Sequence, residues 1–201
     1  LGLSAPLAGL VNQGPAPDFA PLEGFGGVII VKSDNTAINH LQDLKGKTIA
    51  VADTGLMGGF LTQAYELAEI GIDITDEAKI ISTGLPFDHV VESVLAGKAD
   101  AAFLRSGFLE TMAQRDKFPA GTIKVINARN LAEFPYAVST GLYPERPVAK
   151  MPHVDTEIAK RIASALLDLT PGNPVTQALG IHGFSLPYDY ESVRDMSRKL
   201  R

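Results

Sequence analysis

The sequence predicts an α/β fold, in which the strands of a parallel sheet alternate with the helices that cover it. Short apolar runs rich in β-branched residues alternate with amphipathic helical stretches, and the connections between them are short. Parallel strands need crossover connections, which helices usually supply. With 201 residues, of which 45% are apolar and 20% charged, the chain can bury a core in one domain or in two small lobes.

The first predicted elements are two buried strands and the helical turn between them. Residues Gly26–Val31 (GGVIIV) form a β-branched run after a stretch rich in proline and glycine, which is typical of a buried strand. Residues Leu41–Lys47 form one helical turn that ends at Gly46, and the strand Thr48–Ala52 follows directly.

Strand and helix then alternate as far as Ile126. The predicted helices run from the turn at 53–59 to Ile70, over Phe87–Leu95 and over Phe108–Gln114, and the strands cover Lys79–Ser82, Asp100–Leu104 and Thr122–Ile126. This order predicts a parallel sheet covered by helices.

The last third of the chain adds a strand and two helices. Tyr136–Thr140 is a predicted strand, and Tyr190–Leu200 is a short helix whose basic end complements the helix dipole or lies beside a membrane anchor. Asp155–Leu169 is predicted as an amphipathic helix. The side chains expected to face inward from it are Ile158, Ile162, Ala163, Leu166 and Leu169.

The composition excludes several classes of function. The net charge of −5, without a long basic run, argues against nucleic acid as a partner, because phosphate backbones require clustered Lys and Arg. The absence of cysteine excludes disulfides and cysteine nucleophiles. No apolar run reaches the roughly 18–20 residues that span a bilayer. Because Leu1 is no natural start, we expect the chain to be cut or processed from a longer protein.

Catalysis has no support in the sequence. The four histidines show no metal-ligand spacing, and we find no Ser/His/Asp order, no HExxH motif and no paired carboxylates. We therefore expect no catalytic residue, no metal and no cofactor.

A glycine-rich turn after the second strand is the first candidate ligand site. It contains Thr54, Gly55, Gly58 and Gly59 and opens a helix, whose N-terminal N–H groups and dipole favour an anion. The turn lacks the patterns of a P-loop and of a dinucleotide-binding GxGxxG sequence. Tight packing explains its glycines equally well.

Two further candidates also come after predicted strands. Arg105 and Ser106 come after the strand Asp100–Leu104, and ligands of open α/β sheets bind at the carboxyl ends of strands. An arginine there grips a carboxylate or oxyanion with two parallel hydrogen bonds, although an ion pair with Glu110 explains it too. His89 can donate to an anion, but a lone histidine is more often a helix-end or surface residue.

The stretch Phe134–Pro147 places two tyrosines and three prolines around a predicted strand. It predicts an aromatic wall of the site, with Tyr136 as a ligand contact. The alternative is a hinge or a loop that packs on the core.

Taken in order, these segments resemble the phosphonate-binding family of type 2 periplasmic binding proteins. The resemblance rests on GGVIIVKSD, LQDLKGKTIAVAD, the glycine-rich helix start, FDHVVESVLAGKADAAF and FPYAVST, and covers most of residues 25–170. The phrases GKADAAFLRSGFLETMA, STGLYPERP and FSLPYDYESVRDMSRKLR most resemble the periplasmic domains of sensor histidine kinases related to the tetrathionate sensor.

The resemblance implies a two-lobed α/β fold with three-layer αβα sheets. Residues 32–135 would form one complete lobe. Residues 1–31 and 136–201 would form the remnant of a first lobe that lacks its N-terminal strand–helix–strand portion. The resemblance places the anion-binding helix start on residues 54–59 and further ligand contacts on His89 and Arg105. With the two candidates from the sequence pattern added, the predicted ligand-binding residues are Thr54, Gly55, Met57, Gly58, Gly59, His89, Arg105, Ser106 and Tyr136.

The resemblance also implies a ligand and a place in the cell. The turn has fewer hydroxyls than the Ser-Thr-Ser-Gly cluster of the transporter proteins, and Arg105 stands where an amine-binding member has an acid. We therefore expect a plain oxyanion or a carboxylate rather than a phosphonate. The domain would be extracytoplasmic and tethered to the inner membrane, with the kinase portion of the same chain as its partner.

Two alternatives to a sensor domain stay open. One is the substrate-binding protein of a phosphonate- or phosphate-type ABC transporter, and a coding sequence that continues into an apolar segment after Arg201 would argue against it. The other is an α/β enzyme that acts on an acidic small molecule, which turnover of a bound ligand would reveal.

Overall fold

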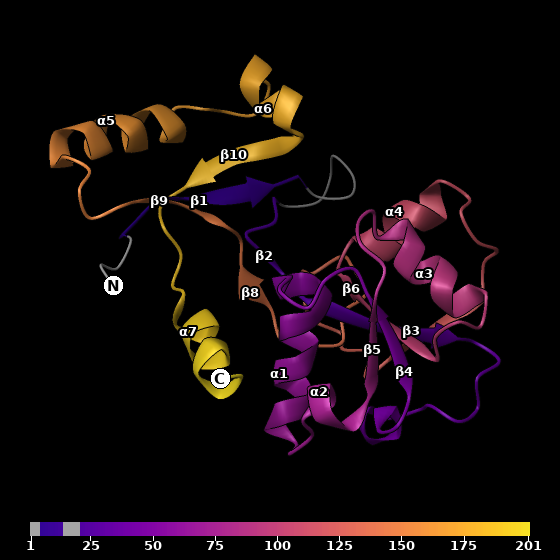
Figure 1. Ribbon diagram of the computed structural model, residues 1–201. Coiled ribbons are helices and arrows are strands. Elements are labelled where there is room, and N and C mark those ends of the chain that lie inside the picture. The colour runs from indigo at the N-terminus through magenta and orange to yellow at the C-terminus, as the bar shows by residue number, and fades with distance from the viewer. Residues whose placement is uncertain (1–4, 14–20) are drawn as a thin grey trace. The chain divides into compact units, whose positions relative to one another are not determined.

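The computed structural model describes residues 5–13 and 21–201 of the chain (Figure 1). The chain divides into two compact units. One consists of Leu1–Phe25 and Tyr143–Ser192, and the other of Gly26–Leu142 and Val193–Arg201. We call them the terminal unit and the central unit. The predicted first-lobe remnant includes residues 1–4 and 14–20, which lie outside the described residues.

The central unit is built on a five-stranded sheet with the order β5-β4-β6-β3-β7. Its strands are β3 (Gly27–Lys32), β4 (Thr48–Val51), β5 (Lys79–Ser82), β6 (Ala101–Arg105) and β7 (Ile123–Ile126). Strand β4 runs parallel to β5 and β6, but β3 runs antiparallel to β6 and β7. The prediction of a wholly parallel sheet is therefore wrong for β3, because an apolar run reads the same in either strand direction.

Helices cover both faces of this sheet (Figure 1). One face carries η1 (Leu41–Leu44), the π-helix η2 (Met57–Leu61), α1 (Thr62–Glu69) and α2 (Ile74–Glu77), and the other carries α3 (Asp88–Leu95) and α4 (Phe108–Gln114). Successive strand residues point to opposite faces of the sheet and pack into one hydrophobic core on each face. Ile29 and Phe103 lie on the α1 face, and Ile30 and Leu104 lie on the α3 face. This is the predicted three-layer αβα arrangement.

The central unit is wider than the predicted lobe of residues 32–135. Strand β3 lies inside its sheet, and the segment predicted as a strand over Tyr136–Thr140 binds β3 without forming one. Ser139 Oγ accepts from Ile29 N at 2.9 Å, and Thr140 Oγ1 accepts from Gly27 N at 2.9 Å. Two side-chain hydroxyls and one backbone bond, from Ser139 N to Gly27 O at 2.8 Å, thus connect this segment to β3 in place of the regular ladder that an extended pattern predicts.

The terminal unit contains a smaller antiparallel sheet with the order β10-β1-β9. Its elements are β1 (Ala5–Asn12), β9 (Pro147–Lys150), β10 (Ile181–Ser185), α5 (Thr156–Leu167) and α6 (Pro174–Leu179), with a short pair of β2 (Gly24–Phe25) and β8 (Tyr143–Pro144). The sequence analysis did not predict β1, because half of its sequence APLAGLVN consists of alanine, glycine and proline, which are uncommon in strands.

Helix α5 does not bury the face that the sequence predicts. Ile158 is 53% exposed and Ile162 is 41% exposed, whereas Ala159 is buried. The helix packs on β1 and β10, and a narrow sheet covers only a narrow stripe of it. The inward orientation predicted for Ile158 and Ile162 is therefore wrong.

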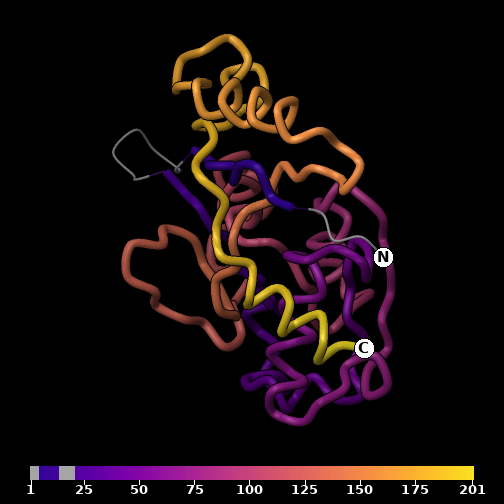
Figure 2. Tube along the Cα trace, turned by 90° about the vertical axis from the view of Figure 1, so that its left-hand side faces the viewer, coloured from indigo at the N-terminus to yellow at the C-terminus, as the bar shows by residue number. Residues whose placement is uncertain are grey.

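Helix α7 (Glu191–Lys199) leads from the terminal unit into the central one and carries the C-terminus (Figure 2). Met196 is only 2% exposed, and Leu200 packs against the α1-side core of the central unit. Lys199 Nζ lies 3.3 Å from Glu69 Oε1 at the end of α1.

Candidate functional site

The sequence-predicted site residues come after three strands at one edge of the central sheet. Thr54, Gly55, Met57, Gly58 and Gly59 follow β4, His89 follows β5, and Arg105 and Ser106 end or follow β6. Because β4 is parallel to β5 and β6, these carboxyl ends meet at the same edge.

Aromatic contacts bring the three segments together. The Cβ of a residue larger than glycine at position 59 would lie 3.0 Å from the Phe87 ring, so this ring covers Gly59. The Phe87 and Phe108 rings are 5.0 Å apart between centroids. The starts of η2, α3 and α4 are therefore neighbours.

The glycine-rich turn already contains one carboxylate. Asp53 Oδ1 accepts from Gly55 N at 2.7 Å, so this N–H has an acceptor within the chain. Helix η2 begins at Met57, and the N–H groups of a first helical turn lack acceptors within the helix. Met57, Gly58 and Gly59 of this turn therefore have N–H groups without an acceptor inside the helix, and both glycines are buried. Sequence reasoning did not identify Asp53.

Arg105 and Ser106 differ in how they are held. Arg105 is half-buried at the end of β6, in register with Gly27. Ser106 is 8% exposed, its Oγ accepts from Gly26 N at 3.0 Å, and its N–H donates to Gly26 O at 2.9 Å. Since a hydroxyl that accepts one bond keeps its own hydrogen, Ser106 can still donate to a ligand.

Glu110, the other partner considered for Arg105, lies in the first turn of α4. Its Oε1 accepts from Ala137 N at 2.7 Å, and this bond ties the loop before β8 to α4. Among the described atoms, its buried Oε2 has no hydrogen-bond partner.

Tyr136 packs beside the Arg105 segment. A side chain at Gly107 would lie 3.1 Å from the Tyr136 ring, and Phe134 meets that ring edge-on at 5.8 Å between centroids. Burial raises the pKa of the Tyr136 hydroxyl, and the Glu110 carboxylate raises it further. Tyr136 therefore stays protonated at neutral pH and can donate a hydrogen bond. These contacts agree with a loop packed on the core, and the role of Tyr136 in an aromatic wall of the ligand site stays a prediction.

His89 is exposed in the first turn of α3. Its carbonyl oxygen accepts from Ser93 Oγ at 2.7 Å within the helix. The imidazole thus belongs to the same edge as the other segments but is not buried among them.

Gln63 is a further residue of this region that sequence reasoning missed. It is fully buried in the first turn of α1, and its amide bonds to η2 and to two strands. From the sequence alone, a buried glutamine in a helix cannot be distinguished from an exposed one.

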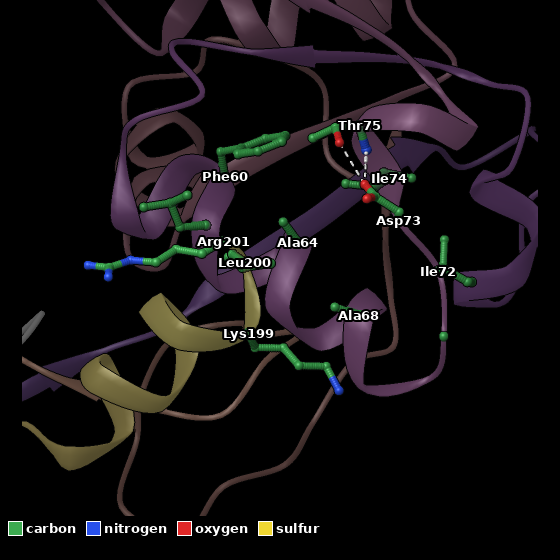
Figure 3. Close-up of a pocket in the computed structure, with 12 residues that line it drawn as sticks. Phe60, Ala64, Ala68, Ile72, Asp73, Ile74, Thr75, Lys199, Leu200 and Arg201 are labelled. Carbon is green, nitrogen blue, oxygen red and sulfur yellow. Dashed lines mark hydrogen bonds between the residues drawn. The ribbon is translucent and has the colours of Figure 1, made fainter.

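A hollow of about 500 Å³ lies away from these residues, beside α7 (Figure 3). Its lining comes from the end of η2, α1, the loop into α2, the start of α2 and the chain end, and includes Phe60, Ala64, Ile72, Lys199 and Leu200. The Asp73 carboxylate at its rim caps α2 by accepting from Thr75 N and Oγ1, which lowers the pKa of Asp73. None of the predicted site residues lines this hollow.

Within residues 5–13 and 21–201, no group of three or more His, Cys, Asp or Glu side chains is placed to hold a metal ion. In the same part of the chain, no helix has both the length and the apolar character needed to cross a membrane.

A family model described as "ABC transporter, phosphonate, periplasmic substrate-binding protein" matches residues 4–190. The chain belongs to this family. The resemblance stated from the sequence is thereby confirmed. The model describes periplasmic substrate-binding proteins, so the chain is an extracytoplasmic ligand-binding domain.

Among curated proteins, the chain is similar to the tetrathionate sensor histidine kinase TtrS of Salmonella typhimurium. The two are 27% identical over 168 residues, which cover 84% of this chain and 28% of the kinase. The chain therefore spans little more than a quarter of that relative.

Solved structures confirm the type 2 periplasmic-binding-protein fold. XAC2383 from Xanthomonas citri, bound to ATP, matches with a TM-score of 0.70 at 18% identity, over 98% of this chain and 70% of that one. PhnD1 from Prochlorococcus marinus, in complex with methylphosphonate, matches with a TM-score of 0.61 at 16% identity, over 98% and 72%. Each of the two is longer than this chain.

Proposed function

We propose that this domain binds a small anion and serves as the extracytoplasmic sensor of a membrane-tethered histidine kinase. The observation that carries the binding role is the convergence of three loop segments, one with Arg105 and one with a helix start, at the carboxyl edge of a parallel sheet. The similarity to the tetrathionate sensor kinase over 84% of this chain supports the sensor role.

In this proposal the ligand is an oxyanion or a carboxylate. The Arg105 guanidinium forms two parallel hydrogen bonds to it, and the N–H groups of Met57, Gly58 and Gly59 bind its remaining charge. Ser106 and Tyr136 donate from hydroxyl groups, while Thr54, Gly55 and His89 lie at the exposed side. Closure around the ligand would favour the closed over the open conformation of the domain, and the kinase portion of the same chain would respond to this change.

The alternative is the binding component of an ABC transporter, which the family description and the likeness to PhnD1 favour. The two functions require different coding sequences downstream of this domain. A full-length gene that encodes an apolar segment and a kinase after Arg201 supports the sensor, and a gene that ends there supports the transporter.

A thermal-shift screen tests the binding role. Its probes are inorganic phosphate, sulfate, methylphosphonate, tetrathionate and small carboxylates, and a ligand at 100 times its Kd adds about 2.7 kcal/mol to stability. At least one of these anions should raise the melting temperature of the wild-type domain.

The variant Arg105→Ala assigns the response to the proposed site. It should abolish the ligand-induced shift, whereas Arg115→Ala, an exposed arginine just after α4 in the same unit, should keep it. An undiminished shift in Arg105→Ala would overturn the role of this residue.

A further inference from the structure

We propose that Gln63 is the positioning residue of the anion site: its buried amide holds the glycine-rich helix start and the Arg105 segment at a set separation. This inference rests on the proposed function and deepens it. Gln63 does not touch the ligand in this proposal. It acts through the backbone of the two segments that do.

One amide nitrogen joins the two segments. Gln63 Nε2 donates to Gly58 O at 2.9 Å and to Leu104 O at 2.8 Å, with a longer contact of 3.3 Å to Val28 O. Gly58 lies between Met57 and Gly59 in the helix start, and Leu104 directly precedes Arg105. The nitrogen has two hydrogens, so the two short bonds use both of them.

The partners leave the amide a single orientation. Three backbone carbonyl oxygens, which only accept, surround the nitrogen, and Gln63 Oε1 accepts from Thr62 Oγ1 at 2.9 Å. Rotating the amide by half a turn would oppose its oxygen to three carbonyl oxygens. The side chain is therefore held in one state rather than sampling two.

The surroundings leave this side chain no room to move. Gln63 and Thr62 are both 0% exposed, and an added Cβ at Gly27 would lie 2.4 Å from Thr62 Oγ1 and 2.5 Å from Gln63 Cδ. The backbone of β3 at Gly27 is thus in direct contact with the amide group. A rigid, fully bonded polar group of this kind transmits position between the elements that it joins.

The helix start needs such support because its own geometry is irregular. Helix η2 is a π-helix, in which Leu61 N donates to Leu56 O at 3.1 Å, five residues back. Such turns are uncommon and cluster at functional sites. By binding Gly58 O inside this turn, Gln63 fixes the direction in which the N–H groups of Met57, Gly58 and Gly59 point.

The test compares Gln63→Met with Ser139→Ala. Methionine keeps the volume and removes both donors. Ser139 is an equally buried polar residue of the same unit, and its hydroxyl bonds Ile29 N and Ile126 O and none of the predicted site residues. Both variants should lower the melting temperature. Only Gln63→Met should weaken the binding of sulfate or inorganic phosphate, by about tenfold or more in calorimetric titrations.

Amide chemical shifts give a second readout that needs no ligand. Gln63→Met should move the ¹⁵N–¹H signals of Met57 and Gly59 together with those of Ser106 and Gly107, and Ser139→Ala should leave all four in place. If Gln63→Met does not fold, Gln63→Asn, which keeps the amide but shortens its reach, takes its place in both measurements.

The outcomes separate the inference from the function on which it rests. Unchanged affinity and unmoved Ser106 and Gly107 signals in a destabilised Gln63 variant would leave this residue a purely structural role and overturn the inference. A wild-type domain that binds neither probe would count against the proposed function for these anions, and the amide shifts would still decide whether Gln63 joins the two segments.

Discussion

At the scale of single residues, the packing around the candidate site depends on glycines as much as on residues with side chains. Gly27 leaves space for the Thr62 hydroxyl and the Gln63 amide, Gly59 for the Phe87 ring, and Gly107 for Tyr136. Each glycine lets an aromatic or amide group lie directly on the backbone. The packing explanation of the glycines in the helix start is therefore correct for Gly59 and compatible with a ligand role for its N–H.

Gly27→Ala should lower the free energy of unfolding by about 2 kcal/mol or more, because overpacking displaces a bonded amide. The new Cβ would meet Thr62 Oγ1 at 2.4 Å, well inside contact distance. Urea denaturation measures the change. Gly141→Ala is the control, since nothing lies within 4 Å of its Cβ position, and equal stability of the two variants would contradict the packing argument.

At the scale of elements, α7 depends on its neighbours for its structure. It has nine residues, and an isolated helix shorter than about 12–15 residues is marginal in water. Met196 is buried, whereas Lys199 and Glu69 are each about half-exposed, so their ion pair contributes little, of the order of 0.5 kcal/mol. The apolar contact rather than the charge pair therefore stabilises α7.

Met196→Asp should release α7 while the rest of the central unit stays folded. Amide hydrogen exchange over residues 195–201 should accelerate by about tenfold or more, because the helix loses the packing on which it depends. Lys199→Ala should leave exchange nearly unchanged. An equal effect of the two substitutions, or a loss of protection in β3 with Met196→Asp, would show that this account of α7 is wrong.

At the scale of the whole molecule, the two units differ in how well their apolar surface is covered. Ten large apolar side chains of the described residues are exposed, and most belong to the terminal unit. Those of the terminal unit are Met151, Ile158, Ile162, Leu167, Val175, Leu179 and Leu186. Exposed apolar groups of this kind are typical of surfaces that other chain segments or partners cover.

Ile158→Lys and Ile162→Lys, on the exposed side of α5, should each change the free energy of unfolding by less than about 0.5 kcal/mol. They should also reduce binding of a hydrophobic dye to the domain. Ala159→Lys places a charge at the buried position of the same helix and should destabilise the terminal unit. Strong destabilisation by the two isoleucine variants would restore the inward orientation that the amphipathic pattern predicted.

Much of the central unit was predictable because its segments are locally consistent. The strands at 26–31, 48–52 and 79–82 and the helices at 87–95 and 108–114 agree with the structure to within a residue or two, and the family followed from their order. Most candidate site residues were found because they come after predicted strands, where ligands of open α/β sheets bind, and Tyr136 was found from its aromatic surroundings. Their shared edge is a property of the structure, and their role in binding stays a prediction.

The sequence by itself determined the α/β class, the elements of the central unit and the family, because hydrophobic periodicity and turn residues act over a few neighbouring positions. Only the tertiary structure decided the direction of β3, the replacement of a strand at 136–140 by hydroxyl contacts, the exposed side of α5 and the burial of Gln63. Each of these depends on which distant segment lies opposite, as when Leu104 and Gly58 meet around Gln63. A local pattern contains no record of such partners, since they are chosen by the packing of the whole unit.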